Sequence, residues 1–344
     1  MPSFLTATVT GIIGERPGLQ RMNVAVDDGR PGDRAYALTD LTGPVAVGDR
    51  VVLNTTAVDL GLGTGGWHVV HWNLARTSWE HPGEGHVMKL RYTSLQCDVG
   101  TSELDHPELT GDLGGTPVIA TLVHSQVGVV AATLKTLRPD LTVSYVMTDG
   151  AALPVALSDL VADLRSRSLL DAVVSAGHAF GGDLEAVGVA SALSLAVEVT
   201  SADVVIAGMG PGVVGTGTRL GTTALDAVPV LDLTDSLGGA PVLAVRASSG
   251  DRRERHLGIS HHTHTVAGLS HSRPWVASVP AEITALEGVR VAETDVSGAA
   301  RIGEVLDELD LRITTMGRDH RADGVFFEAA AAAAIVALDL LPAS

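Results

Sequence analysis

The sequence predicts an α/β fold, with a mostly parallel sheet covered by helices and preceded by a small N-terminal β-barrel-like domain. The first observation is length, because 344 residues exceed the usual size of one domain. The second is that Gly, Pro and Asp divide the first hundred residues into short segments rich in β-branched residues. The third is a change near Thr116, after which strand-like runs alternate with stretches of helical spacing. We therefore expect a β-barrel or β-sandwich domain at 1–100 and an α/β domain at 101–344.

The N-terminal domain shows little helical spacing, so we expect it to consist of short strands. These strands are Leu5–Ile13, Met22–Val26, Ala35–Leu38, Asp49–Asn54 and Trp67–Trp72. Several short strands separated by turn residues are typical of a small barrel or sandwich.

The α/β domain alternates apolar strands with helical stretches, which predicts a mostly parallel sheet with helices on both faces. The expected strands are Val118–Val123, Thr142–Met147, Ala172–Ser175, Val204–Ala207, Val228–Leu231, Val242–Val245, Trp275–Val279 and Val289–Ala292. The expected helices are Val127–Leu137, Val155–Leu169, Leu184–Val199, Ala300–Leu309 and Ala329–Leu341. The last contains six consecutive alanines, which favour a helix and allow close packing.

Composition excludes several classes of function. The formal net charge of −17 repels polyanions and anionic lipid surfaces, so we expect no nucleic-acid partner and no membrane partner. Cys97 is the single cysteine, so no intrachain disulfide can form. The start of the chain lacks the features of a signal peptide, and the longest apolar run, Ala329–Val336, is too short to span a bilayer. We expect a cytoplasmic protein, and the sequence leaves open whether it forms a homo-oligomer.

Polar side chains follow the expected strands repeatedly, and ligands bind beyond the carboxyl ends of parallel strands. The residues in these positions include His124, Ser125, Asp149, His178, Asp183, Asp232, Arg246, Ser248 and the run Gly208–Gly221. A ligand site is therefore expected along this edge of the sheet. A serine hydrolase is disfavoured, because Ser125 does not lie in a G-x-S-x-G turn.

The run Gly208–Gly221 is the strongest candidate, because glycines let backbone N–H groups converge on an anion. Gly210, Gly212 and Gly215 have the spacing G-x-G-x-x-G, and Asp232 follows where a dinucleotide fold keeps its ribose-binding acid. Pro211 and the trailing glycines argue against that fold, which leaves another phosphate- or carboxylate-bearing ligand, or a purely conformational loop. The residues selected for ligand binding are Gly210, Gly212, Gly215, Thr216, Gly217, Thr218, Arg219, Asp232, His124 and Ser125.

A second cluster, residues 252–264, contains three arginines and four histidines. On a strand His262 and His264 would share one face, which suits a divalent transition metal, and His256 or His261 could join them. The alternatives are histidines that bind backbone or an anionic substrate, and a solvated run of charge. The selected catalytic residues are His178, Asp149, Asp183 and His262, as acid–base or metal groups. Asp183 could instead cap a helix that starts near Leu184.

Six phrases occur together and in order along the chain. They are LGLGTGG (60–66), MKLRYT (88–93), YVMTDG (145–150), FGGDLEAV (180–187), GPGVVGTGT (210–218) and GISHHT (258–263). With them the chain resembles the bacterial proteins of domain-of-unknown-function family 3866, over nearly its whole length. The resemblance implies no activity and no site residues.

The leading hypothesis is an enzyme that acts on a small phosphorylated or nucleotide-like metabolite bound at 208–221. In it, Gly210–Thr218 hold the anion and Arg219 pairs with it. The alternatives are a non-catalytic sensor that uses the same loop and a scaffold whose glycines serve packing. Whether the chain is an enzyme, and whether a divalent metal assists it, stay open at this stage.

Overall fold

The computed structural model describes residues 2–27, 32–63, 65–83, 85 and 87–342. The chain divides into two compact units, Met1–Gly100 and Thr101–Ser344. Within the described residues, no helix is both long and apolar enough to cross a membrane.

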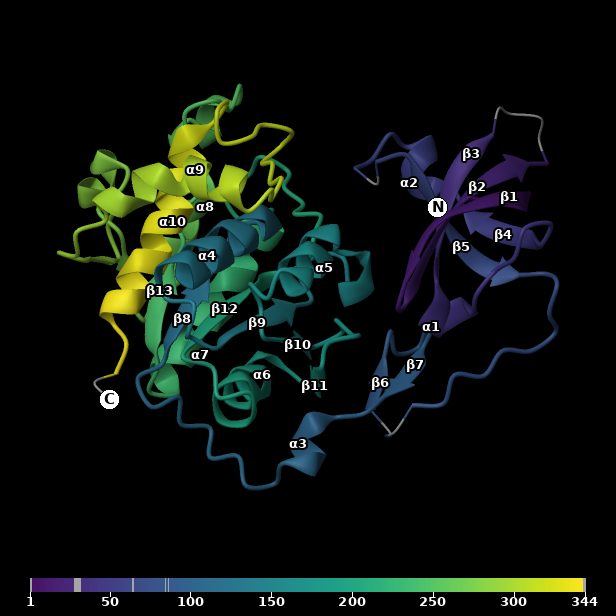
Figure 1. Ribbon diagram of the computed structural model, residues 1–344, viewed down its shortest axis with the longest axis horizontal. Coiled ribbons are helices and arrows are strands. Elements are labelled where there is room, and N and C mark those ends of the chain that lie inside the picture. Colours follow the sequence, from purple (N-terminus) through teal and green to yellow (C-terminus); the bar gives the residue numbers. More distant parts are fainter. Residues whose placement is uncertain (1, 28–31, 64, 84, 86, 343–344) are drawn as a thin grey trace. The chain divides into compact units, whose positions relative to one another are not determined.

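The first unit contains a closed barrel with the strand order β1-β2-β3-β5-β4 (Figure 1). Its strands are β1 (Phe4–Arg16), β2 (Leu19–Val26), β3 (Asp33–Leu38), β4 (Arg50–Asn54) and β5 (Trp67–Asn73). Only β3 and β5 pair in parallel among these strands. This order and pairing are those of an OB-type barrel, an architecture that hosts many functions and by itself assigns none. All five expected strands are confirmed.

Short elements complete the first unit, and the barrel has its own core. The short elements are α1 (Thr39–Thr42), α2 (Thr56–Asp59), β6 (Val87–Lys89) and β7 (Cys97–Val99). Val9, Met22, Val24 and Leu53 point into the barrel and are buried, as alternation along each strand requires.

The second unit is built on an eight-stranded sheet in which every neighbouring pair is parallel. The strands, in sheet order, are β11 (Leu184–Ala186), β10 (Ala172–Ala176), β9 (Val143–Thr148), β12 (Val204–Met209), β8 (Pro117–Ala120), β13 (Ala240–Leu243), β16 (Trp275–Val276) and β17 (Arg290–Val291). The predicted mostly parallel sheet is therefore confirmed. Its central strands β8, β9 and β12 are buried along their whole length because helices cover both faces.

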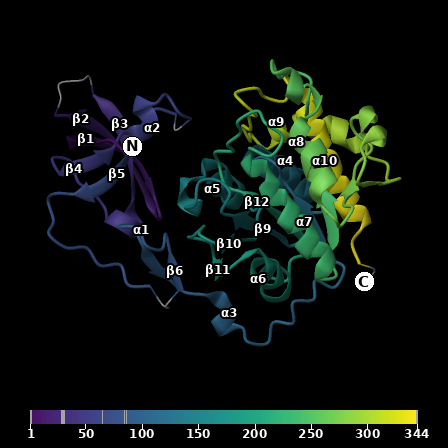
Figure 2. The same ribbon diagram turned by 180° about the vertical axis from the view of Figure 1, so that it is seen from behind.

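Helices lie on both faces of this sheet. One face carries α4 (His124–Leu137), α5 (Asp159–Ser166), α9 (Ile302–Glu308) and α10 (Gly324–Asp339), in front in Figure 1. The other carries α6 (Val189–Ser194), α7 (Ala227–Ser236) and α8 (His261–Leu269); α7 and α8 are in front in Figure 2. The short α3 (Ser102–Asp105) precedes the sheet. The alanines of α10 are buried against the sheet and α4, which confirms their packing role.

The order of the strands creates a crevice at the carboxyl edge. β8 and β12 are neighbours, yet the chain leaves β8 into α4 on one face and leaves β12 toward α7 on the other. Loops that diverge to opposite faces open a crevice between them, which is where α/β sheets bind ligands.

Two expected elements are wrong, and the expected helix Leu184–Val199 is confirmed only from Val189 onward. Val228–Leu231 is not a strand but part of α7, whose buried residues at 227, 230, 231 and 234 have helical spacing. A short apolar run does not distinguish the two structures by itself. Leu184–Val199 begins with strand β11, and its helix starts only after Gly188. The segment with His262 and His264 is helix α8, so these two side chains do not share a strand face.

Candidate functional site

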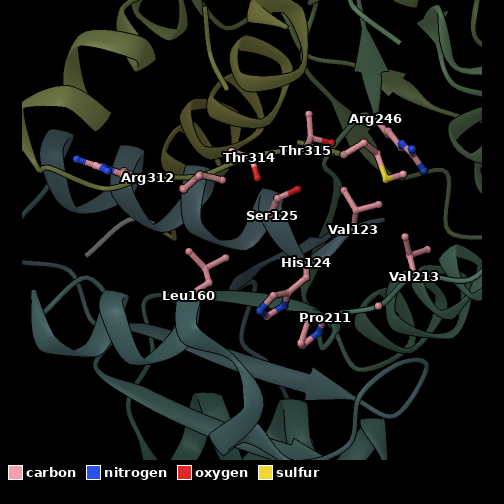
Figure 3. A pocket seen from close by; sticks show the side chains of 13 residues that line it. Val123, His124, Ser125, Leu160, Pro211, Val213, Arg246, Arg312, Thr314 and Thr315 are labelled. Atoms are coloured by element: carbon pink, nitrogen blue, oxygen red, sulfur yellow. The ribbon is translucent and has the colours of Figure 1, made fainter. Parts of the chain in front are cut away.

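A cavity of about 320 Å³ lies at the carboxyl edge, beside the crevice between β8 and β12. It is formed by the start of α4, the loop after β12, Arg246 after β13, and the segment that precedes α10. Its lining residues are Val123, His124, Ser125, Leu160, Pro211, Gly212, Val213, Arg246, Arg312, Ile313, Thr314, Thr315 and Met316. Figure 3 shows Arg246 and Arg312 at opposite sides of this cavity, with Ser125 and Thr314 between them.

Arg246 is the most unusual of these residues, because only 5% of its surface is exposed. Its backbone is fixed to α8, since its N–H donates to Thr263 Oγ1 at 3.0 Å and its carbonyl accepts from the same hydroxyl. Its Nη1 donates to His262 Nδ1 at 2.9 Å. Among the described residues it forms no ion pair with a carboxylate. Burial, and then the neighbouring charge of Arg253, lower the pKa of its guanidinium to about 10.

The nearby carboxylates are already occupied by other arginines. Asp251 accepts from Arg253 through both of its oxygens, at 2.9 and 2.7 Å, and from Arg318 at 3.2 Å. These bonds hold the pKa of Asp251 well below its usual range. Asp323 accepts from Ser248 Oγ at 2.6 Å and from Arg318 Nε at 3.0 Å. Arg246 therefore faces the cavity without a carboxylate of its own.

The first turn of α4 adds donors to the same cavity. The Gln126 side chain accepts from the backbone N–H groups of Leu122 and Val123, at 2.9 and 3.3 Å. The next two N–H groups, those of His124 and Ser125, belong to the first turn of α4 and therefore have no acceptor inside the helix. A helix N-terminus with its positive dipole end favours an anion.

His124 organises this turn. Its Nδ1 donates to the Met209 carbonyl at 3.1 Å, and its Nε2 accepts from Ser158 Oγ at 2.7 Å. Burial lowers the pKa of His124 to about 4, so the ring is neutral at pH 7. Because both nitrogens are engaged, His124 ties α4 to β12 and α5, while Ser125 presents its hydroxyl to the cavity.

The glycine-rich run passes from this cavity toward the histidines. Pro211, Gly212 and Val213 line the cavity, and Gly212 has a φ of +104° that suits glycine. Further along, a Cβ placed on Gly215 would lie 3.7 Å from His262 Nε2, so the loop backbone packs against that ring.

The rest of the run forms a closed turn. Thr216 N–H donates to the Gly221 carbonyl at 2.8 Å, and the Thr216 and Thr218 hydroxyls are 2.9 Å apart. No regular helix follows Gly215 directly, since α7 begins only at Ala227. Gly210, Gly212 and Gly215 therefore do not form a dinucleotide turn.

Three imidazoles gather next to Arg246. They belong to His256, His261 and His262, and one nitrogen from each lies within 4.8 Å of the others. Arginine has no acceptor atom, so the hydrogen bond from Arg246 uses the lone pair of His262 Nδ1 and leaves the proton on Nε2. That arrangement does not offer His262 Nε2 to a metal ion. His264 lies outside this group of three.

The electrostatic surroundings of this group are positive. Burial, followed by the charge of Arg246, lowers the pKa of both His256 and His262 to about 3. Burial and then Arg255 lower the pKa of His261 as well. Neutral imidazoles among guanidinium groups suit an anion better than a cation.

Of the remaining predicted residues, Asp149 and His178 lie in contact at the carboxyl edge of the sheet. Asp149 lies at the carboxyl end of β9, where its Oδ2 accepts from the His178 N–H at 2.9 Å. Next to it, Asp226 is a residue that the sequence reading missed, and its pKa is raised by burial and by the charge of Asp149. The sequence analysis selected residues that follow expected strands, whereas Asp226 precedes the expected strand Val228–Leu231.

Asp183 and Asp232 have structural partners. Asp183 Oδ2 accepts from the Val173 N–H at 2.8 Å and pairs with Arg165, so it caps no helix. Asp232 lies in α7, where its Oδ1 accepts from Ser270 Oγ at 2.6 Å and from the His271 N–H at 2.9 Å. It therefore does not occupy the position of a ribose-binding acid.

A family model described as "Protein of unknown function (DUF3866)" matches residues 34–334, a range that includes every residue lining the cavity. A search of curated proteins finds no match to the chain.

Proposed function

The chain belongs to domain-of-unknown-function family 3866, and from its geometry we propose that it is an enzyme acting on a small phosphorylated or nucleotide-like metabolite. The observation that carries this proposal is Arg246, a buried guanidinium that faces a cavity and has no carboxylate partner among the described residues. A buried charge without a partner is costly, and an anionic ligand removes that cost.

The other groups around the cavity complement a phosphate. Its oxygens can accept from Arg246, from the free N–H groups at the start of α4 and from the Ser125 hydroxyl. Val123, Leu160 and Ile313 provide an apolar wall for the uncharged part of the ligand. The volume of about 320 Å³ is near the lower end of the usual range for ligand pockets, which favours a small metabolite.

His262 is the group best placed to move a proton in response to the ligand. Its Nδ1 accepts from Arg246, and burial, followed by the positive charge of that arginine, lowers the pKa of the ring and keeps it neutral. An anion bound at Arg246 compensates this charge, so the pKa of His262 rises toward its ordinary value. Binding of the anion therefore makes His262 easier to protonate than in the empty site, which favours a role for it in acid–base catalysis.

Ligand-induced stabilisation tests this function. We expect inorganic phosphate, or a member of a panel of sugar phosphates and mononucleotides, to raise the melting temperature of the wild-type protein. A ligand at a hundred times its Kd adds about 2.7 kcal/mol to the free energy of unfolding. Arg246→Met should abolish this gain, while the ligand-free variant stays as stable as wild type or becomes more stable, since an unpaired buried charge is removed.

Arg252→Met is the matched control, because Arg252 is an exposed arginine of the same segment that does not line the cavity. It should respond to ligand as wild type does. A full ligand response in Arg246→Met would place the anion elsewhere and overturn the proposal. If a stabilising ligand is not converted, as followed by ³¹P NMR, the protein is a sensor and the enzymatic part is wrong.

A further inference from the structure

Another pocket, of about 460 Å³, lies further along the glycine-rich run. We name it the loop pocket, and its lining residues are Gly217, Arg219, Arg255, His261, His264 and Thr265. It is formed by the closed turn of the run, the segment before α8, and the first residues of α8.

Two exposed arginines, Arg219 and Arg255, line the loop pocket. Within the described part of the chain, neither Arg219 nor Arg255 forms an ion pair, and no acidic side chain lines the pocket. By contrast, Arg253, two residues before Arg255, is held by both oxygens of Asp251. Two unpaired guanidinium groups facing one pocket are the arrangement that binds a phosphate or a carboxylate.

An imidazole nitrogen adds to this observation. His261 Nε2 is buried and has no hydrogen-bond partner among the described residues. A buried polar atom without a partner is costly, and a ligand oxygen or a water molecule can satisfy it. Gly217, which also lines the pocket, has a φ of +82° that favours glycine, and a Cβ added there would lie in ordinary contact range of the Arg255 guanidinium.

The loop pocket is connected to the first cavity through two sets of contacts. One is the glycine-rich run itself, since Pro211–Val213 line the cavity and Gly217 lines the loop pocket. The other is a row of side chains in which Arg246 donates to His262, and the His262 ring lies 4.3 Å from the His261 ring. The two pockets are therefore linked by residues that contact one another.

We propose that the substrate carries two anionic groups, one bound at Arg246 in the cavity and the other bound between Arg219 and Arg255 in the loop pocket. The class of substrate is a bisphosphate, or a metabolite with one phosphate and one carboxylate. This inference rests on the proposed function, because it extends the same site.

Matched pairs of ligands test the inference by isothermal titration calorimetry. The probes are phosphate with pyrophosphate, and fructose 6-phosphate with fructose 1,6-bisphosphate, so that the two anions are close in one pair and distant in the other. In at least one pair we expect wild type to bind the doubly anionic member about 10- to 100-fold more tightly, the range of a charge-assisted hydrogen bond. Arg219→Ala and Arg255→Ala should remove this preference and leave affinity for the singly anionic member within about twofold.

The controls separate this inference from the proposed function. Arg252→Ala removes an equal charge from the same segment and should keep the preference. If wild type binds both members equally, or if the preference survives in Arg219→Ala and Arg255→Ala, the loop pocket is not an anion subsite. If Arg246→Met leaves the affinity for the singly anionic member unchanged, or if wild type binds none of the probes, the proposed function itself fails. Tight binding of Zn²⁺ alone that both His261→Ala and His264→Ala abolish would assign the loop pocket to a metal and overturn the inference.

Discussion

Arg246 and Arg318 are both largely withdrawn from solvent on the carboxyl side of the same sheet, yet their partners differ. Arg318 bridges two buried acids, with Nη2 3.2 Å from Asp251 and Nε 3.0 Å from Asp323. Arg246 donates to a neutral histidine instead and faces a cavity. Arg318 has its counter-charges within the chain and holds two segments together. Arg246 has no carboxylate partner among the described residues, and in our proposal an anionic ligand supplies the counter-charge. The two arginines are therefore predicted to respond in opposite ways to substitution.

The largest expected effect is a loss of stability when Asp323, one of the two acids paired with Arg318, is replaced. Asp323 is fully buried and accepts from Ser248 Oγ, from the Ser249 N–H and from Arg318. Removing one partner of a buried ion pair costs up to about 3–5 kcal/mol. Arg318 keeps Asp251, but Ser248 Oγ and the Ser249 N–H also lose their acceptor. We therefore expect Asp323→Ala to lower the free energy of unfolding by about that amount, as measured by urea denaturation.

Arg246→Met gives the comparison for that measurement, since it removes a charge of similar burial without separating an ion pair. Its ligand-free stability should equal or exceed that of wild type. Equal losses in Asp323→Ala and Arg246→Met would mean that both arginines are structural, and the distinction between them would be wrong.

The histidines beside Arg246 should make stability depend on pH. Their pKa values in the folded protein, about 3 for His256 and His262, lie below the ordinary value of 6.5. As the pH falls below about 6.5, the unfolded chain binds protons that the folded protein does not, so the free energy of unfolding decreases. The decrease approaches about 1.4 kcal/mol per pH unit for each histidine, and it ends near the folded pKa.

Substitution separates this contribution from that of other groups. His262→Asn should make the decrease between pH 6.5 and pH 4 shallower, whereas His264→Asn, in the same helix but outside the cluster, should not. A saturating anion should also reduce the slope, because it compensates the charge of Arg246. An identical slope in His262→Asn and wild type, measured by denaturation at several pH values, would exclude this origin.

Much of the fold could be predicted from the sequence, because burial on one or both faces leaves a local pattern. The five barrel strands and the central strands of the sheet follow alternation or continuous apolar runs. The errors occurred where local patterns agree with two structures. Val228–Leu231 is apolar at every position, and only the wider spacing of its buried neighbours identifies helix α7.

The site was less accessible to sequence reasoning, because partners distant in the chain decide each role. Asp232 follows the glycines at a suggestive spacing, but residues about 40 positions later occupy its carboxylate. Arg246 was recognised as a strand-end residue but was not selected. Arg246 differs from Arg253 because Asp251 pairs with Arg253 in the folded protein. The spacing of residues along the sequence does not show which arginine Asp251 will contact.

Within the glycine-rich run, Gly212 and Gly215 are predicted to differ in how well they tolerate alanine. Gly212 has a φ of +104°, so alanine there is strained even though the space around it is open. Gly215 has no such φ, and an added Cβ would meet its nearest neighbours at an ordinary 3.6–3.7 Å. Gly212→Ala should lower the free energy of unfolding by about 1 kcal/mol and weaken phosphate binding, because the loop that lines the cavity must shift. Gly215→Ala should leave both nearly unchanged. If Gly215→Ala weakens binding more than Gly212→Ala does, the anion lies against the His262 side of the loop, and the cavity at Arg246 is not its main site.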